Sequence, residues 1–170
     1  MKRYRNPMAK RIRKEHGMKG LVLAIGAAVA ALSLTFGLSV ASASSSSGGA
    51  GTKVAVASSK LGRILVDRRG RTLYLFEKDK NGKSACYGAC ASYWPPLLTR
   101  AKPVAGARVK AKVLGVTRRK NGTRQVTYAG HPLYRYVADS KAGQTTGEGS
   151  TLFGAGWDVV APSGKKIESD

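Results

Sequence analysis

Two pairs of residues have the types and spacing that could support chemistry. Cys86 and Cys90 are the only cysteines in the chain, and their spacing suits either a disulfide or a site for a soft metal ion. Asp79 and Asp139 each follow a tyrosine by five positions, so together they could serve as an acid and a base or hold a cation. His131 is the only histidine beyond the first 20 residues.

The cysteine pair is expected to form a disulfide, because an even number of cysteines at short spacing in an exported protein usually does. Closing the short loop from Cys86 to Cys90 constrains the unfolded chain by about 2 kcal/mol. The alternative is a redox or Cu(I) site in which His131 joins the two thiolates. All three methionines lie in the first 18 residues, so they supply no further soft ligand, and we expect no cofactor.

The two aspartates are expected to cap turns, with each carboxylate accepting hydrogen bonds from backbone N–H groups of the loop that follows it. A glycan-processing enzyme would instead need the carboxylates of Asp79 and Asp139 within about 10 Å of each other across a cleft. Serine–histidine–aspartate catalysis would need a positioned serine, and none is marked near His131. The sequence therefore predicts a non-enzymatic protein without catalytic residues.

A repeated stretch positions these residues. The segment from Gly70 to Asp79 (GRTLYLFEKD) returns as Gly130 to Asp139 (GHPLYRYVAD), and residues 53–79 align with residues 113–139 without a gap. The repeated motif comprises Gly70, Tyr74, Phe76, Asp79 and Trp94 in the first copy and Gly130, Tyr134, Tyr136, Asp139 and Trp157 in the second. Such repetition indicates one supersecondary unit used twice.

Each copy is typical of a β-meander with turns at its glycines. The expected strands cover residues 54–58, 63–67 and 72–77 in the first copy, and 123–128 and 132–137 in the second; a short helical turn is considered near residues 85–91. In the third strands the aromatic side chains share one face, while Leu75 on the other face is replaced by Arg135. We therefore predict an all-β fold of two tandem pseudo-symmetric β-meander repeats in one domain, with the aromatic face in its core.

The N-terminal 43 residues have the three parts of a signal peptide. A basic region is followed by the uncharged run 21–40 and by Ala41-Ser-Ala43, after which cleavage is expected. No Arg-Arg pair precedes the apolar run, so the general secretion route is predicted. The alternative is an uncleaved, helical membrane anchor with the rest of the chain outside.

The remaining chain divides by composition. We expect a Ser/Gly linker over 44–52, repeat 1 over 53–98, an inter-repeat linker over 99–112, repeat 2 over 113–162 and a tail over 163–170. From Ser44 onward the chain has 22 Lys and Arg against 8 Asp and Glu, a net charge of +14. Because an exported protein rarely meets nucleic acid, anionic cell-wall polymers or lipid headgroups are the expected partners. Solubility and non-specific adhesion are the simpler interpretation, and no oligomeric state is indicated.

The combination of motifs resembles a family of bacterial secreted and lipoprotein repeats with a Tyr-x4-Asp motif. The resemblance covers residues 53–162 and includes the Cys86…Cys90…Trp94-Pro-Pro-Leu segment and the Gly156-Trp157-x-Val-Val segment. Two departures are the absence of a cysteine after Ala43 that could carry a lipid, and Glu148 in place of an expected glutamine. The family has no established molecular function, so the resemblance implies a fold and an extracellular location but no activity.

Overall fold

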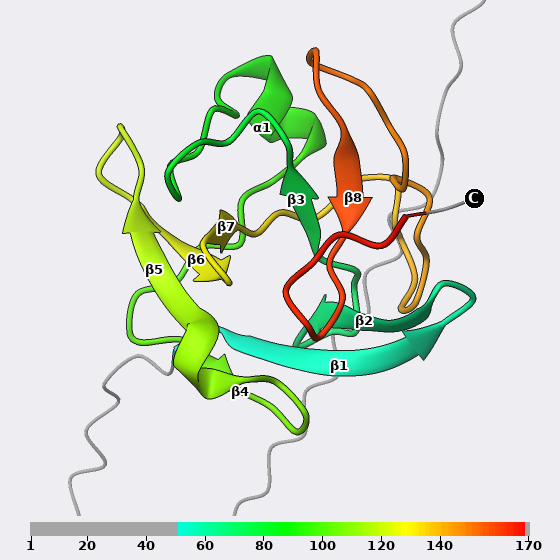
Figure 1. Ribbon diagram of the computed structural model, residues 1–170. Coiled ribbons are helices and arrows are strands. Elements are labelled where there is room, and N and C mark those ends of the chain that lie inside the picture. The colour runs from blue at the N-terminus through cyan, green and yellow to red at the C-terminus, as the bar shows by residue number, and fades with distance from the viewer. Residues whose placement is uncertain (1–50, 169–170) are drawn as a thin grey trace, which may run out of the picture. The chain divides into compact units, whose positions relative to one another are not determined.

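The computed structural model describes residues 51–168, which form a domain of short β-strands (Figure 1). The elements in chain order are β1 (Lys53–Ser59), β2 (Gly62–Asp67), β3 (Tyr74–Phe76), α1 (Ala89–Tyr93), β4 (Val104–Ala105), the 3-10 helix η1 (Ala111–Val113), β5 (Leu114–Arg118), β6 (Arg124–Tyr128), β7 (His131–Pro132) and β8 (Trp157–Val159). The predicted all-β class is confirmed. The predictions of a signal peptide, its cleavage site and a possible membrane anchor fall outside the described residues.

Two antiparallel hairpins begin the two repeats, as the alternation of apolar residues predicts. β1 pairs with β2, and β5 pairs with β6. In Figure 1 the β1–β2 hairpin lies beneath the short β3–β8 pair, and the β5–β6 hairpin lies beside that pair. The segment expected to be an inter-repeat linker contributes β4, which adds to β1 as a parallel strand.

The gapless alignment of the repeats holds for the first and third strands but is one residue out of register in the second. The Leu65 N–H donates to the carbonyl of Val160, and the Leu65 carbonyl accepts from the N–H of Leu73. Val126 makes the equivalent two bonds with Leu97 and Leu133. The reason is a pair of compensating length changes. The first turn of repeat 2 is one residue longer, and its second turn, Ala129-Gly130, is one residue shorter than Arg68-Arg-Gly70.

The third strands exchange partners between the repeats. β3 of repeat 1 pairs with β8 of repeat 2, and the equivalent segment of repeat 2 bonds to the segment that ends α1, with Arg135 N donating to Pro95 O and Val137 N to Tyr93 O. The expected strand over 132–137 is therefore not continuous. Its successive residues bond to different neighbours, so only His131–Pro132 remains a regular strand, β7.

Both faces of the third strands are buried, so the domain has two apolar clusters. The aromatic face contributes Tyr74 and Phe76 to one cluster, as predicted, together with both tryptophans. The opposite face contributes Leu73 and Leu75 to a second cluster that includes Leu133. The sequence pattern pointed to the aromatic face alone, because Arg135 interrupts the apolar residues of the other face in repeat 2.

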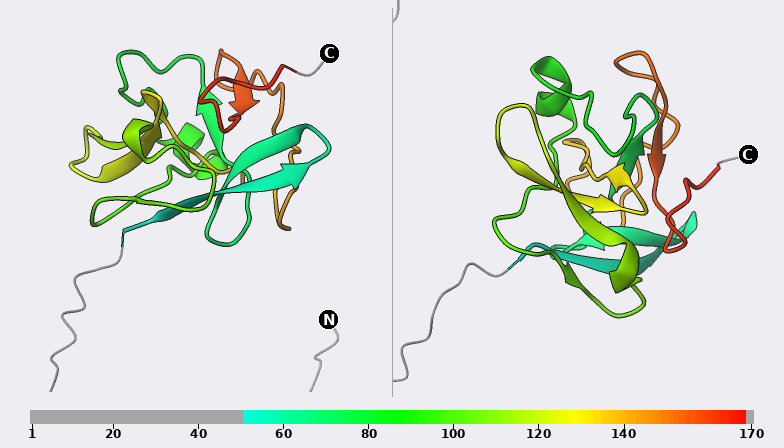
Figure 2. Two further views of the ribbon diagram at one scale, coloured as in Figure 1. Left: turned by 60° about the horizontal axis from the view of Figure 1, so that its bottom comes forward. Right: turned by 60° about the vertical axis from the view of Figure 1, so that its left-hand side comes forward.

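α1 and the turn that enters β8 lie at the same end of the domain, as Figure 1 and the right view of Figure 2 show. Beyond β8 the expected tail turns back, and Ile167 N donates to Val159 O at 2.8 Å. Across residues 51–168, no helix has the length and apolar character needed to span a bilayer.

Candidate functional site

The centre of the domain is an approximately twofold arrangement of the two repeat motifs. Tyr74 and Tyr134 form an antiparallel bridge, in which each backbone N–H donates to the carbonyl of the other at 2.9 and 3.0 Å. Gly70 and Gly130 precede these strands with φ of +78° and +85°. Glycine adopts this left-handed backbone without steric cost, which explains its place at both turns.

Each tyrosine hydroxyl bonds to the aspartate of the other repeat. Tyr74 Oη donates to Asp139 Oδ2 at 2.5 Å, and Tyr134 Oη donates to Asp79 Oδ2 at 2.7 Å. The remaining oxygen of each carboxylate caps the following loop. Asp79 Oδ1 accepts from the backbone N–H of Ala85 at 2.7 Å, and Asp139 Oδ1 accepts from the backbone N–H of residue 146 at 3.0 Å. The four motif residues therefore link the repeats and fix two loops.

The electrostatics of these pairs suit a structural role. Burial raises the pKa of Tyr74 and of Tyr134 well above the ordinary value, and the neighbouring carboxylates raise both further. Burial also raises the pKa of Asp79, opposed by the hydrogen bonds from the Ala85 N–H and the Tyr134 hydroxyl. A phenol that stays protonated is a hydrogen-bond donor rather than a nucleophile, so each pair works as a buried cross-link.

A continuous stack of four aromatic rings seals the centre. Phe76 stacks on Trp157, Trp157 on Trp94, and Trp94 on Tyr136, with ring centroids 4.0, 4.0 and 4.3 Å apart. Phe76 and Tyr136 thus each lie against the tryptophan of the other repeat. Both tryptophans are fully buried, so they contribute to packing and offer no surface to a ligand.

Arg119 is a buried cation that sequence reasoning missed. Its guanidinium donates to Gln125 Oε1 at 2.6 Å, Ser84 Oγ at 2.8 Å and the Cys86 carbonyl at 2.6 Å, and lies 4.4 Å from the centre of the Tyr87 ring. Three hydrogen-bond acceptors and one aromatic ring among the described residues therefore surround the charge of Arg119. No short-range signal marks this set, because Ser84, Cys86 and Tyr87 lie more than 30 positions before Arg119.

The cysteines form the predicted disulfide, with Cα atoms 5.3 Å apart. Both residues are buried in the aromatic cluster, so the bond fixes the loop that leads into α1. His131 is exposed on β7 and is not part of that cluster. Within residues 51–168, no group of three His, Cys, Asp or Glu side chains is arranged to hold a metal ion.

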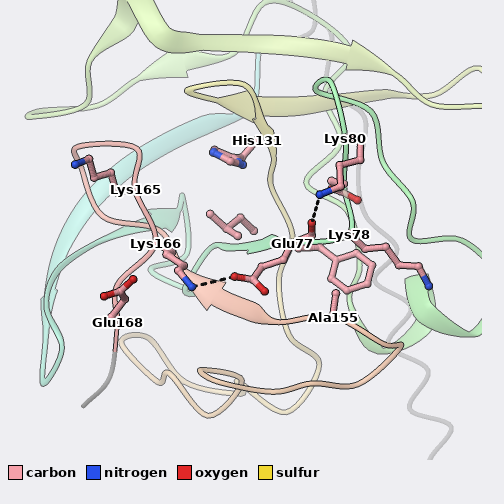
Figure 3. Close-up of a pocket in the computed structure, with 11 residues that line it drawn as sticks. Glu77, Lys78, Lys80, His131, Ala155, Lys165, Lys166 and Glu168 are labelled. Atoms are coloured by element: carbon pink, nitrogen blue, oxygen red, sulfur yellow. Dashed lines mark hydrogen bonds and ion pairs between the residues drawn. The ribbon is translucent and has the colours of Figure 1, made fainter.

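One of the surface hollows in residues 51–168 is named here the lysine hollow. Its lining is Leu75, Phe76, Glu77, Lys78, Asp79, Lys80, His131, Ala155, Lys165, Lys166 and Glu168. Figure 3 shows Lys166 and Lys80 bonded to Glu77, with His131 apart from them. Lys166 Nζ lies 2.9 Å from Glu77 Oε1, and the ammonium group of Lys166 lowers the pKa of Glu77. The lining of this hollow has three acids against four lysines, so its charges are nearly balanced.

The second hollow, named the arginine groove, has little acid to balance its bases. Its lining is Gly51, Thr52, Lys53, Asp67, Arg68, Arg69, Arg71, Pro96, Leu97, Leu98, Val104 and Arg135. Asp67 is the single acid in this lining, against four arginines and one lysine. The groove lies where the end of β2, the start of β1 and the segment after α1 meet, and has a volume of about 740 Å³.

Comparison with known proteins identifies the class. A family model described as a secreted repeat of unknown function matches residues 55–98 and 115–161, so two copies of the repeat are present. The chain belongs to this family, and it is a secreted protein. Neither the curated proteins nor the solved structures give a match to this chain.

Proposed function

We propose that this protein is a non-enzymatic module of the cell envelope or extracellular space, exported by the general secretion route, that binds an anionic surface partner such as a cell-wall polymer. The observation that carries the proposal is the separation of charge between surface and interior. Of the 22 lysines and arginines in residues 51–168, all are exposed except Arg71, Arg119 and Arg135. Of the seven acids, only Glu77 and Glu168 are exposed.

The interior acids are used by the fold. Asp79 and Asp139 accept hydrogen bonds from tyrosines and loop N–H groups, and Glu148 accepts from the backbone N–H of Val159. The outer surface therefore presents a positive field that is stronger than the net charge suggests. Such a field attracts polyanions and raises their local concentration.

A non-enzymatic role is supported by the way in which the reactive residues are used. The tyrosine–aspartate pairs, the residues most suggestive of acid–base chemistry, hold the two repeats together. Their hydroxyls and carboxylate oxygens already have partners within the protein. An acid–base catalyst needs a group within hydrogen-bond reach of its substrate, whereas Tyr74, Tyr134 and Asp139 are buried and both oxygens of Asp79 accept hydrogen bonds from the protein.

The alternative function, redox or copper handling through the cysteine pair, has less support. The sulfur atoms of Cys86 and Cys90 are bonded to each other and buried, whereas reactive cysteines are accessible thiolates. Thiol titration of the native secreted protein should find no free thiol. Free thiols of low pKa, or copper that copurifies with the protein, would favour the redox or copper function instead.

Co-sedimentation with insoluble cell-wall material is the direct test of the proposal. Binding to material that retains its anionic polymers should be strong at about 50 mM salt and weaken steeply toward about 500 mM, because salt screens the attraction. Material stripped of those polymers is the matched control and should bind weakly at every salt concentration. Absent binding, or binding that salt does not change, would contradict the proposal.

A further inference from the structure

The arginine groove holds more positive charge than its own acid can neutralise. Arg68 and Arg69 lie in the turn after β2, and Arg71 follows that turn. Arg135 comes from repeat 2 and Lys53 from the start of β1. Segments that are distant in the chain therefore bring five cations to one groove. Like charges gathered in this way repel one another unless an anion lies among them.

The single acid of the groove is already fully used. Asp67 is 5% exposed, and its Oδ1 accepts the backbone N–H groups of Arg69 and Arg71 at 2.8 and 3.1 Å. Its Oδ2 accepts hydrogen bonds from Nε and Nη2 of Arg71 at 3.2 and 3.0 Å. Asp67 therefore shapes the turn and orients Arg71, and it makes only a longer ion pair, at 3.9 Å, with Arg135.

Arg135 is the least satisfied of these cations. Its nearest carboxylate oxygen, Asp67 Oδ2, is 3.9 Å from Nη1, and its Nε is buried without a hydrogen-bond partner. Burial lowers the pKa of Arg135, and the guanidinium groups of Arg71 and Arg69 lower it further. A buried donor without a partner costs free energy even where the rest of the side chain is half-buried. The equivalent residue of repeat 1 is Leu75, so the fold does not require an arginine here.

We propose that the arginine groove binds a phosphate group, held by Arg135 and the arginines of the turn after β2. This inference rests on the proposed function and names the chemical group of the anionic partner. A single guanidinium fork matches a carboxylate. Guanidinium groups that come from two separate segments instead suit a tetrahedral phosphate, which presents oxygens in several directions. The exposed apolar side chains of Leu98 and Val104 in the same lining offer contacts to the carbon chain of a phosphodiester polymer or lipid.

The test measures binding of an oligomer of glycerol phosphate to the secreted protein and to Arg135→Leu by titration calorimetry. Arg118→Leu is the matched control, because it removes the same charge from an exposed position on β5, outside the groove. Loss of charged hydrogen bonds should weaken binding by Arg135→Leu about tenfold or more, with Arg118→Leu within about twofold of the native protein. Arg69→Gln, at an exposed position, gives a second groove variant that leaves the core untouched.

Equal weakening by the groove and control variants would overturn the groove assignment while leaving the proposed function in place. Binding of polyglutamate as tight as that of the oligomer would overturn the choice of phosphate. Addition of inorganic phosphate should shift the Arg135 Nε–H signal in NMR spectra, and an unshifted signal would contradict a site at this residue. A shift without any binding to cell-wall material would uphold the groove and reject the proposed function.

Vesicles with and without phosphatidylglycerol distinguish the two sources of the phosphate. Weaker binding to these vesicles than to the soluble oligomer supports a phosphodiester polymer as the ligand. Tighter binding to the vesicles, again lost in Arg135→Leu, supports a phosphate of a lipid headgroup in the same groove. Vesicle binding that is unaffected by Arg135→Leu counts against the groove as the phosphate site.

Discussion

The lysine hollow and the arginine groove contain equivalent positions of the two repeats, yet they differ in how their charges are balanced. Leu75 and His131 line the first, and their counterparts Arg135 and Arg71 line the second. In the lysine hollow an exposed ion pair joins Lys166 to Glu77. In the arginine groove Asp67 is occupied by Arg71 and by backbone N–H groups.

The centre of the molecule shows the opposite behaviour, because there the repeats remain alike. Each tyrosine hydroxyl bonds the aspartate of the other repeat, and each tryptophan ring packs edge-on against the tyrosine of its own repeat. A substitution in one copy would break a contact made by the other, so the shared centre preserves the fold. The two hollows lie outside this constraint and are free to differ. The turn after β2, one residue longer than its counterpart, carries Arg68 and Arg69 into the groove.

The largest expected effect is the loss of a ring from the shared centre. Trp157→Ala should lower the free energy of unfolding by about 3–5 kcal/mol, since it removes a fully buried indole from the middle of the stack. Tyr93→Ala, at a side chain 51% exposed, is the control and should cost less than about 1 kcal/mol. Urea unfolding measures both. Equal losses would show that the stack is not the centre of stability.

An arginine introduced into the lysine hollow tests whether an arginine on this face of the third strand needs an acid at the position of Asp67. Leu75→Arg should lower the free energy of unfolding by about 3 kcal/mol, because Leu75 is 4% exposed and Tyr128 occupies the place that Asp67 has in repeat 1. Val137→Arg, at a side chain 53% exposed, should change it by less than about 0.5 kcal/mol. A well-tolerated Leu75→Arg would remove the distinction between the hollows.

The two tyrosine–aspartate pairs should differ in strength even though their geometry matches. Tyr74→Phe should cost about 2 kcal/mol, because it leaves Oδ2 of Asp139, a residue only 3% exposed, without its donor. Tyr134→Phe should cost about 1 kcal/mol, since Asp79 is more exposed and can recruit water. The comparison is made by chemical unfolding at pH 7. The reverse order would mean that burial of the aspartate does not set the strength of the pair.

The smallest effect concerns pH. Burial raises the pKa of Asp158 above its ordinary value of 3.8, opposed by Lys166, and its Oδ2 has no hydrogen-bond partner. The folded state therefore binds this proton more tightly than the unfolded chain. The free energy of unfolding should decrease as pH rises from about 4 through the raised pKa. Asp158→Asn should flatten this decrease and add about 1 kcal/mol at pH 7, as measured by unfolding across pH 3–8. An unchanged slope would exclude Asp158 as its source.

The sequence alone determined the fold class, the repeat, the disulfide and the family, because each of these depends on local pattern. Alternating apolar residues, glycines at turns and a short cysteine spacing act within a few positions of the chain. The same pattern also indicated that Tyr74 and Tyr134 lie on a buried face. The pattern could not reveal that the third strands exchange partners between the repeats. In a tandem repeat the same strand sequence can pair within its own repeat or with the other one, and only the packing of the folded domain decides between them.

Only the tertiary structure decided where charge is satisfied and where it is not. Arg119 and Arg135 look alike in the sequence, yet Arg119 donates three hydrogen bonds and Arg135 has a buried Nε without a partner. Their surroundings come from residues far away in the chain, and electrostatic free energy depends on distances that spacing does not encode. The positive charge was therefore visible in the composition, whereas its concentration in one groove required the folded arrangement of both repeats.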